Sequence, residues 1–438
     1  MKRKKKITKK KSKYEIKHPK NLIKQKRKRF LSKLSIILFL IISVIFLFVQ
    51  DKIKIPLEQY QASIFPEILS FENNVDLSQD LFDEFRKVNS ENKLLYNTKF
   101  KKSDNPDITV VMTLYNQAHC IHKGLRSVQN QSIKNIEIII VDDCSFDNST
   151  DVIKEFQKDD PRIILISHES NKGEMKSRTD GIRKAKGKYI TILDGDDAFI
   201  HKDILKNSLF IINKAKLDIV EFNWALYRRG ILRYVNNYYF TNITNIIYQP
   251  ELRQKFIFTQ GRTQSKLRNR IIWGKLIKNE LLQKVLNDLG TKYIDDYNND
   301  NEDTIIAISL FRLAKSYYIM KEVGYYYSND EKRHRFPPKG NILCKNNNKI
   351  KRFGLYKFFK FMIEKYSSDN TEKNLIINEM RSIDHNRFFK KDLEKTHYEI
   401  MFNVYDNILT WKSLNKRQKE YIIKLRNKAI DKRNNDNK

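Results

Sequence analysis

Short apolar runs alternate with amphipathic, charged stretches between Asp107 and about Phe199. The runs are rich in β-branched residues and nearly continuous in hydrophobicity, which is typical of strands buried on both faces. The stretches between them have helical periodicity. This alternation predicts βαβ units and a mainly parallel sheet. We expect strands at 108–116, 136–143, 162–167 and 189–197, and helices at 118–130, 149–159 and 172–186.

The pattern is less regular in the second half of the chain. A strand is expected near 219–227, and helices are expected near 275–286 and 304–315. Residues 331–438 are basic, rich in Asn and helical in period, which predicts a helical extension. Near the other end, residues 51–105 mix charged and apolar positions without strand alternation. We interpret them as a stem that contains a helix or two.

One stretch near the N-terminus carries no charge. Residues 34–50, LSIILFLIISVIFLFVQ, span about 25 Å as a helix, close to the roughly 27 Å hydrocarbon core of a thin bilayer. A cleaved signal peptide is one alternative, but the charged region before the stretch is long and no A-x-A pattern follows it. A buried core helix is another, but core helices rarely lack every polar stripe. The pattern favours a single transmembrane helix.

Basic residues are concentrated in front of this stretch. The net charge of the 438 residues is +33, and residues 1–33 hold 17 Lys or Arg and one acid, Glu15. Such a tail can bind nucleic acid, lie on an anionic membrane, or remain solvated and set membrane topology. Because an apolar span follows directly, we favour the last interpretation and expect no nucleic-acid partner. The positive-inside rule places the tail in the cytoplasm and the bulk of the chain across the membrane.

Acidic residues gather where the fourth predicted strand ends. Asp194, Asp196 and Asp197 lie within one turn of each other. Carboxylates this close repel one another unless a cation neutralises them, and Mg²⁺ or Mn²⁺ prefers such oxygen ligands. A solvated turn is the alternative, because D-G-D-D is also good turn composition. The position after a buried strand favours a metal site, since ligands of parallel sheets bind beyond the carboxyl ends of the strands.

A second acidic pair, Asp142 and Asp143, ends the second predicted strand. A carboxylate in this place is able to accept hydrogen bonds from a nucleotide base or a ribose hydroxyl. The alternative is a cap at the start of the next helix. Local sequence alone leaves both interpretations open.

Residues 108–203 resemble the family-2 inverting glycosyltransferases, which have the GT-A fold. The resemblance is continuous and keeps the order and spacing of the family. It implies a Rossmann-like α/β fold with a mostly parallel sheet flanked by helices. One departure is Cys144, where the family usually has a small residue such as Gly. The matching segments are VVMTLYNQ, SVQNQSIKNIEIIIVDDCSFDNSTDVIKEF and DPRIILISHESNKGEMKSRTDGIRKAKGKYITILDGDD.

The resemblance implies which residues bind the nucleotide sugar. Thr113 and Tyr115 match positions that line the base, although both residue types also suit a strand. Asp143 matches the acid that reads the base. Arg178 matches an arginine that faces the donor, where a guanidinium suits diphosphate or ribose contacts.

The same resemblance assigns the acids of the DGDD segment. Asp194 and Asp196 match the D-x-D pair, which binds the ribose and the metal that bridges the diphosphate. Asp197 is adjacent, and we expect it to share the metal with Asp196. The implied cofactor is Mn²⁺ or Mg²⁺.

The general base and the acceptor site are expected later in the chain. Asn301-Glu302-Asp303 is similar to the late acidic dipeptide of the family at a helix start, so we predict Asp303 as the base and Glu302 as second choice. A helix N-terminus also favours a carboxylate without catalysis. Trp273 is a candidate for stacking on the acceptor sugar, or equally a core residue. The Q-x-x-R-W motif of processive members is absent from the sequence, which favours transfer of one sugar.

The sequence therefore predicts a metal-dependent inverting glycosyltransferase for hexosyl or N-acetylhexosaminyl transfer. Its partners are a nucleotide-sugar donor and a glycan, glycoprotein or glycolipid acceptor, and its catalytic domain is expected in the lumen of the endoplasmic reticulum or Golgi. The alternative is a catalytically silent membrane protein that binds a glycan or nucleotide sugar. The predicted organisation is a basic tail (1–33), a transmembrane helix (34–50), a stem (51–105), a GT-A domain (106–330) and a helical C-terminal extension (331–438).

Overall fold

The structure is a computed structural model that describes most of the chain between residues 99 and 436. Within these residues no helix is long and apolar enough to cross a bilayer. The predicted transmembrane helix at 34–50 and nearly all of the predicted stem lie outside the described residues. The described ranges are 99–228, 231–234, 246–252, 271–294, 302–328, 354–368, 370–381 and 395–436.

The first half of the described chain forms the predicted βαβ units. Four parallel strands lie in the order β3-β2-β1-β4. Every residue of β1, β2 and β4 is buried, which explains why their sequences are nearly continuous in hydrophobicity. The α/β fold and these seven elements are confirmed. Their bounds are β1 Ile108–Leu114, α4 Ile121–Gln129, β2 Ile136–Asp142, α5 Ser149–Asp159, β3 Ile163–Ser167, α6 Glu174–Lys184 and β4 Tyr189–Asp194.

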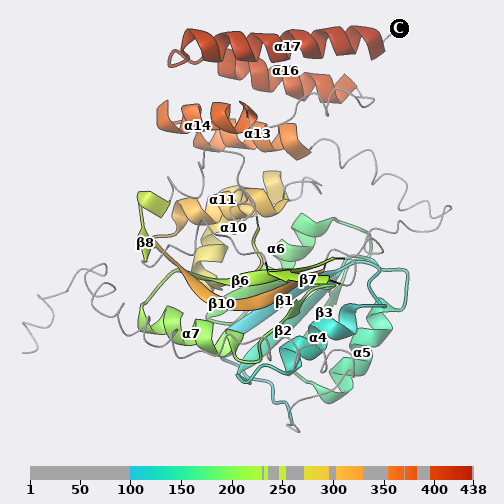
Figure 1. Ribbon diagram of the computed structural model, residues 1–438. Coiled ribbons are helices and arrows are strands. Elements are labelled where there is room, and N and C mark those ends of the chain that lie inside the picture. Colours follow the sequence, from blue (N-terminus) through green and yellow to red (C-terminus); the bar gives the residue numbers. More distant parts are fainter. Residues whose placement is uncertain are drawn as a thin grey trace, which may run out of the picture. The chain divides into compact units, whose positions relative to one another are not determined.

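The strand order reverses direction between β1 and β4. From β1 the chain moves outward to β2 and β3, and then returns to pair β4 with the other side of β1. Right-handed crossovers therefore place α4 and α5 on one face of the sheet and α6 on the other, as Figure 1 shows. A reversal of this kind opens a crevice at the carboxyl ends of the two central strands.

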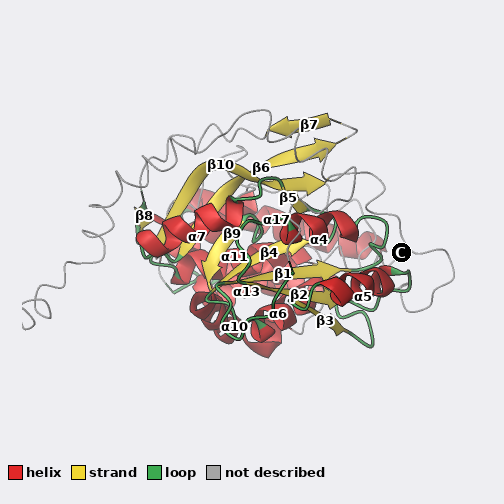
Figure 2. Cartoon of the chain, turned by 90° about the horizontal axis from the view of Figure 1, so that it is seen from below, coloured by secondary structure: helices red, strands yellow, loops and turns green. Residues whose placement is uncertain are grey.

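The second half of the chain extends the sheet with antiparallel and parallel pairs. In the described residues the sheet continues from β4 through β9, β6 and β10 to β5, and β7 pairs with β6 beside this path. Figure 2 shows the sheet with β7 at the top and β3 near the bottom. The sheet is therefore mixed, whereas the sequence predicted a mainly parallel one. The remaining strands are β5 Ala198–Phe199, β6 Ile219–Arg228, β7 Ile231–Tyr234, β8 Ile247–Tyr248, β9 Lys275–Lys278 and β10 Ser316–Ser328.

The predicted helix at 275–286 was wrong in its first turn. Residues 275–278 form β9, which pairs antiparallel with both β4 and β6, and α10 (Asn279–Ile294) begins only after it. The KLIK sequence is too short for its period to separate strand from helix. Tertiary pairing decides, because β9 fills the gap between two buried strands. The predicted strand at 219–227 and helix at 304–315 are confirmed as β6 and α11 (Glu302–Leu313).

Helices cover the sheet and continue to the C-terminus. Alpha-helix α7 (Ile204–Lys214) packs on β6, and α10 packs on α6 and α11. The C-terminal helices share one hydrophobic core with α10 and α11, and the Ser309 hydroxyl of α11 hydrogen bonds the Tyr366 hydroxyl at 2.7 Å. These helices are α13 Gly354–Tyr366, α14 Asn370–Arg381, α16 Lys395–Leu409 and α17 Lys416–Asp436.

A buried ion pair fixes the connection between α5 and β3. Arg162 donates from Nε and Nη2 to the two carboxylate oxygens of Asp160 at 2.8 and 2.7 Å, and both side chains are at most 1% exposed. The guanidinium lies 4.0 Å from the ring centroid of Phe100. Removing one partner of such a pair leaves an uncompensated charge in the core.

We predict that Asp160→Ala lowers the free energy of unfolding by about 3–5 kcal/mol, because the Arg162 charge stays buried without its partner. Urea denaturation measures the change. The matched control is Glu155→Ala, which removes an ion pair with Lys158 whose side chains are 68% and 67% exposed. The control is expected to change stability by less than about 1 kcal/mol. Equal effects of the two substitutions would contradict the prediction.

Candidate active site

The site lies where β1 and β4 end side by side. Thr113 of β1 is in register with Asp194 of β4, and both side chains are largely buried. Gly195 follows at once, and its N–H donates to the Thr113 carbonyl at 3.1 Å. A Cβ on Gly195 would lie 2.1 Å from Oε1 of Gln117 and 3.0 Å from that carbonyl. The glycine of DGDD therefore lets the turn close onto the end of β1.

Arg178 joins three carboxylates in this crevice. Its guanidinium donates to Asp194 at 2.8 Å and to Glu174 at 2.5 Å, and it also hydrogen bonds Asp303. The arginine side chain is 1% exposed. The partners come from α6, the end of β4 and the start of α11, so one cation gathers predicted site residues from distant parts of the sequence.

The environment of Asp303 suits a proton acceptor. Its side chain is 21% exposed. Burial raises the pKa of Asp303 to about 7, Arg178 acts to lower it, and the charges of Asp194 and Glu174 raise it. A carboxyl group with a pKa near neutrality exchanges protons efficiently at physiological pH. Glu302, the second predicted base, is the first residue of α11, and its side chain lies outside what the structure describes.

Asp197 connects the DGDD turn to β10. Its Oδ2 accepts a hydrogen bond from the Tyr325 hydroxyl at 2.8 Å, and its Oδ1 accepts one from the Ser328 N–H at 2.8 Å. The same Tyr325 hydroxyl accepts the N–H of Asp194 at 3.3 Å. Burial and these acids raise the pKa of Tyr325 well above its usual value. The hydrogen bonds from Tyr325 and Ser328 therefore attach the DGDD turn to β10.

Asp196 lies between Asp194 and Asp197 in the sequence, and it is 5% exposed. In the part of the chain that the structure describes, no three His, Cys, Asp or Glu side chains form a group able to hold a metal ion. Any cation at Asp196 would thus take further ligands from a substrate. The metal roles of Asp196 and Asp197 stay predictions.

Asp143 is held at the end of β2 by three donors. Its Oδ1 accepts hydrogen bonds from Nδ1 of His168 and the N–H of Lys172, and its Oδ2 accepts the N–H of Gly173, each at 2.8 Å. Gly173 is the N-cap of α6 with φ 86°. Asp143 therefore fixes the loop from which the helix of Arg178 begins.

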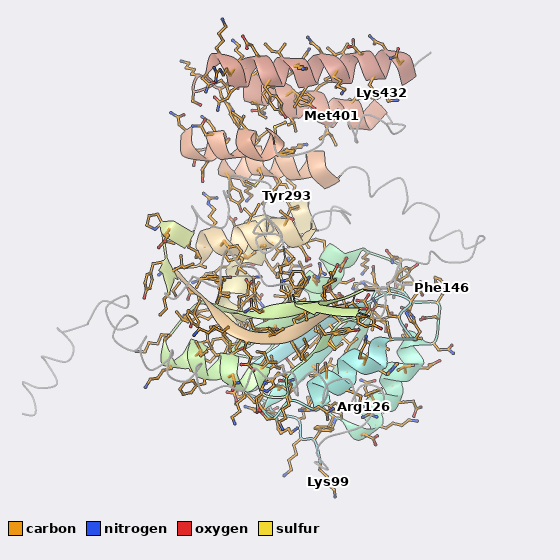
Figure 3. The ribbon with its side chains drawn as sticks, viewed as in Figure 1. Lys99, Arg126, Phe146, Tyr293, Met401 and Lys432 are labelled. Atoms are coloured by element: carbon orange, nitrogen blue, oxygen red, sulfur yellow. The ribbon has the colours of Figure 1, made fainter. Side chains whose placement is uncertain are left out.

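Two aromatic rings stand at the tip of β1. The ring of Tyr115 meets that of Phe146 edge to face, with centroids 6.1 Å apart. Phe146 is 44% exposed and labelled on the outside of the domain in Figure 3. Thr113, the other residue predicted to line the base, is 7% exposed. An edge-to-face pair at an open strand end offers an apolar surface to a nucleotide base.

Trp273 lies inside an aromatic cluster. It stacks on Tyr325 and Tyr327 with centroids 4.5 and 5.2 Å apart, and it meets Trp224 edge to face. Only 5% of Trp273 is exposed. This placement supports the core interpretation that the sequence left open, and a stacking role on an acceptor sugar stays a prediction.

Cys144 has a positive φ of 65°. A residue with a side chain is strained in this left-handed region, whereas glycine is not. The turn after β2 therefore explains why the resembling family usually has a small residue here.

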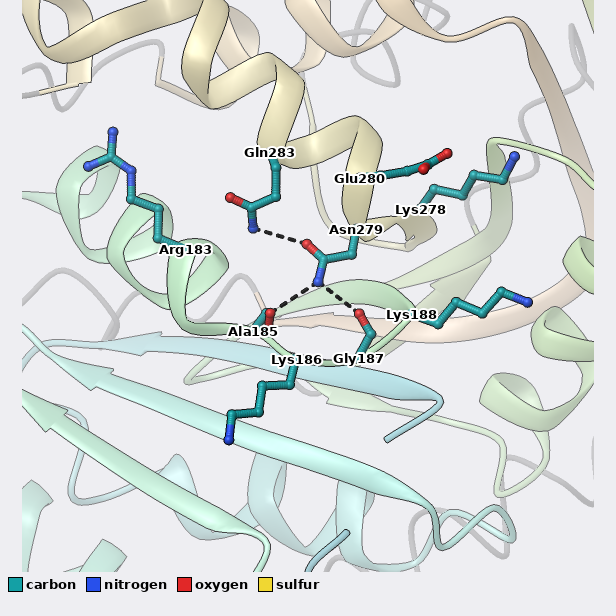
Figure 4. Close-up of a pocket in the computed structure, with 9 residues that line it drawn as sticks. All are labelled: Arg183, Ala185, Lys186, Gly187, Lys188, Lys278, Asn279, Glu280 and Gln283. Carbon is teal, nitrogen blue, oxygen red and sulfur yellow. Dashed lines mark hydrogen bonds between the residues drawn. The ribbon is translucent and has the colours of Figure 1, made fainter. Parts of the chain in front are cut away.

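A hollow of about 630 Å³ lies at the other end of β4. Figure 4 shows Asn279 of α10 reaching across it to the carbonyls of Ala185 and Gly187, at 3.0 and 2.8 Å. None of the predicted site residues lines this hollow. It sits at the amino end of the strand, away from the crevice where the acids converge, and we do not assign the active site to it.

Sequence reasoning missed several residues that shape the site. Glu174 lies one helical turn before Arg178, so its spacing was a usable signal. His168 and Tyr325 offered none, because each meets its acid only through the tertiary fold.

Known glycosyltransferases are similar to this domain in sequence. Residues 109–286 match the family model described as Glycosyl transferase family 2. Over these residues, which make up less than half of the chain, the protein is similar to the family 2 glycosyltransferases. It is 29% identical to glycosyltransferase GlyA of Streptococcus pneumoniae over 48% of this chain and 30% of that protein. It is 28% identical to an uncharacterized glycosyltransferase of Methanocaldococcus jannaschii over 50% of this chain and 79% of that protein.

Solved structures are similar to this chain in fold. The crystal structure of S. aureus TarS 1–349 has a TM-score of 0.53 and 16% identity, covering 74% of this chain and 88% of that one. The same protein in complex with UDP-GlcNAc has a TM-score of 0.50 at 16% identity, covering 74% and 89%. Identity this low shows the fold alone, which is GT-A-like. The matched region spans less than a third of GlyA.

Proposed function

We propose that the protein is an inverting glycosyltransferase that moves one sugar from a nucleotide-sugar donor to a hydroxyl of a glycan, glycoprotein or glycolipid. One observation carries the proposal: the Arg178 guanidinium binds both Asp194, at the end of β4, and Asp303, at the start of α11. An inverting transfer needs a donor-binding group and a base near one anomeric carbon. The attacking hydroxyl must approach the anomeric carbon opposite the leaving phosphate. The donor-binding group and the base therefore have to lie on opposite sides of that carbon, both close to it.

Each residue has a distinct task in this reaction. Thr113, Tyr115 and Asp143 bind the base of the nucleotide, and Asp194 binds the ribose. Asp303 takes the proton of the acceptor hydroxyl, and the oxygen of that hydroxyl bonds to the anomeric carbon. The bond from that carbon to the diphosphate oxygen breaks, and the electron pair leaves with the diphosphate. Supporting this assignment, burial brings the pKa of Asp303 to about 7.

We infer that the site would hold Mn²⁺ or Mg²⁺, and such a cation would offset the negative charge of the leaving diphosphate. Asp196 is the preferred protein ligand. Asp197 would first have to give up its hydrogen bonds to Tyr325 and Ser328. A site with few acidic ligands suits such a cation, because Mg²⁺ commonly combines one or two carboxylates with substrate phosphates.

We predict that the purified protein hydrolyses at least one nucleotide sugar in the presence of Mn²⁺ and that chelation abolishes this turnover. Asp303→Asn should lower transfer to an acceptor by about 10²–10⁴-fold, because the amide takes no proton. A screen of nucleotide sugars that measures released nucleoside diphosphate, with and without EDTA, tests the first statement. The same assay with an added acceptor, run on the wild type and on Asp303→Asn, tests the second.

The matched control is Asp288→Asn, which changes an acid of α10 that is 41% exposed and forms an ion pair with Lys365 of α13. It should keep wild-type turnover. Binding of a nucleotide sugar without any turnover would instead favour the silent binding protein. Loss of activity in the control equal to that in Asp303→Asn would remove the case for Asp303 as base.

We further infer that residues 34–50 anchor the enzyme in a membrane with residues 1–33 in the cytoplasm. The uncharged run and the basic tail before it support this proposal. A lumenal position of the domain, in the endoplasmic reticulum or Golgi, stays a prediction from the same pattern.

We predict that the full chain sediments with membranes and resists carbonate extraction, and that deletion of residues 1–50 releases it. Fractionation followed by immunoblotting measures this. Recovery of the full chain in the carbonate supernatant would contradict the anchor.

A further inference from the structure

His168 is a buried residue that none of the proposed catalytic steps uses. It follows β3 directly, and its side chain is 4% exposed. Its N–H donates to the Asp142 carbonyl at 2.9 Å, so the backbone is fixed beside the end of β2. The ring lies between two carboxylates: Nδ1 is 2.8 Å from Oδ1 of Asp143, and Nε2 is 3.3 Å from Oδ2 of Asp180. A buried polar ring in this position calls for an explanation beyond packing.

The contact with Asp143 limits what that carboxylate is able to bind. A carboxylate has about four acceptor positions. Three are used by His168, Lys172 and Gly173, and two of these donors share Oδ1. The acceptor capacity that remains is on Oδ2, and its direction is set by the three donors together. Without the His168 contact, rotation of the carboxyl group about its Cβ–Cγ bond would be opposed by backbone N–H groups alone.

The other side of the ring faces the helix that carries Arg178. Asp180 lies two residues after Arg178 on α6, and its Oδ1 also accepts Lys176 at 3.0 Å. His168 thereby lies between Asp143, which is proposed to bind the nucleotide base, and α6. Arg178 of this helix binds Asp194 and Asp303. His168 therefore connects Asp143 to Asp180, and α6 connects Asp180 to Arg178.

We propose that His168 is a positioning residue for donor recognition: its Nδ1–H fixes the Asp143 carboxylate so that Oδ2 accepts an N–H from the nucleotide base. This inference rests on the proposed function, since it needs a nucleotide donor. A base with a ring N–H next to a carbonyl, such as uracil or guanine, fits this acceptor. Cytosine lacks such an N–H and fits it poorly.

Two amide substitutions separate the two sides of the ring. The Asn amide nitrogen occupies nearly the place of Nδ1, and the Gln amide nitrogen nearly that of Nε2. His168→Asn therefore keeps a donor for Asp143, whereas His168→Gln keeps one for Asp180 alone. His168→Gln should raise the donor KM about tenfold with kcat within about threefold, the loss expected for one hydrogen bond to a charged group. His168→Asn should stay within about threefold of wild type in both.

A matched control exists in a second buried histidine. His201 is 7% exposed and its Nδ1 lies 2.5 Å from Oε1 of Glu322, away from the nucleotide residues. His201→Gln should leave the donor KM unchanged, whatever it does to the melting temperature. In His168→Gln the preference for UDP or GDP, whichever the wild type binds, over CDP should also fall about tenfold. General loosening of the fold would not produce this change in preference.

The outcomes are distinct. Wild-type KM and base preference in His168→Gln would overturn the inference and leave the proposed function intact. Equal damage in the Asn and Gln variants would also overturn it and indicate a purely structural histidine. If the wild-type protein binds no nucleoside diphosphate, the proposed function fails first. If the Gln variant does not fold, ¹⁵N NMR of wild-type His168 decides: the Nδ1 resonance should shift when nucleoside diphosphate is added, and an unmoved resonance would overturn the proposal.

Discussion

One buried guanidinium organises this active site. Burying a charge is costly unless it is paired, and a lone Arg178 at 1% exposure would destabilise the fold. The acids around it have the opposite problem, because Asp194 and Asp303 would repel each other without a cation between them. Each side therefore makes the other tolerable. The result is that α6, β4 and α11 meet at one point with their polar ends turned inward.

This arrangement divides the crevice into parts with different character. At the end proposed to bind the nucleotide base, three donors hold Asp143. Tyr325 and Ser328 hold the DGDD turn. At the other end Asp303 has a partly exposed side chain and a pKa of about 7. A fixed donor side and an adjustable proton acceptor are what a transfer between two substrates requires, because the donor must be oriented before the acceptor loses its proton.

The local pattern of the sequence predicted the first half of the fold well. Strands buried on both faces have unmistakable apolar runs, and strand–helix alternation then fixes a parallel sheet. It failed at β9, where four residues take their conformation from the strands on either side. The antiparallel half of the sheet was missed for the same reason, since its pairings join segments far apart in the chain.

The residues of the candidate site could be named from the sequence, but their contacts with one another could not. Arg178, Asp194 and Asp303 were singled out from motifs. The sequence did not predict that they bind one another, because Arg178 and Asp303 are 125 residues apart. Asp197 looked equivalent to Asp196 in sequence, and the structure distinguishes them because β10 supplies a hydroxyl and an N–H to one of them. His168 carried no local signal. The anchor at 34–50 lies outside the described residues and rests on hydropathy and charge.

The pH dependence of kcat/KM in the wild-type enzyme and in Arg178→Gln tests the central claim most directly. In the proposed reaction Asp303 accepts a proton only when it is deprotonated, so wild-type kcat/KM should rise with pH and level off above about 7. Arg178 lowers the pKa of Asp303, so its removal should move the midpoint to higher pH as well as reduce the plateau. A variant whose midpoint stays where the wild type has it would contradict the account.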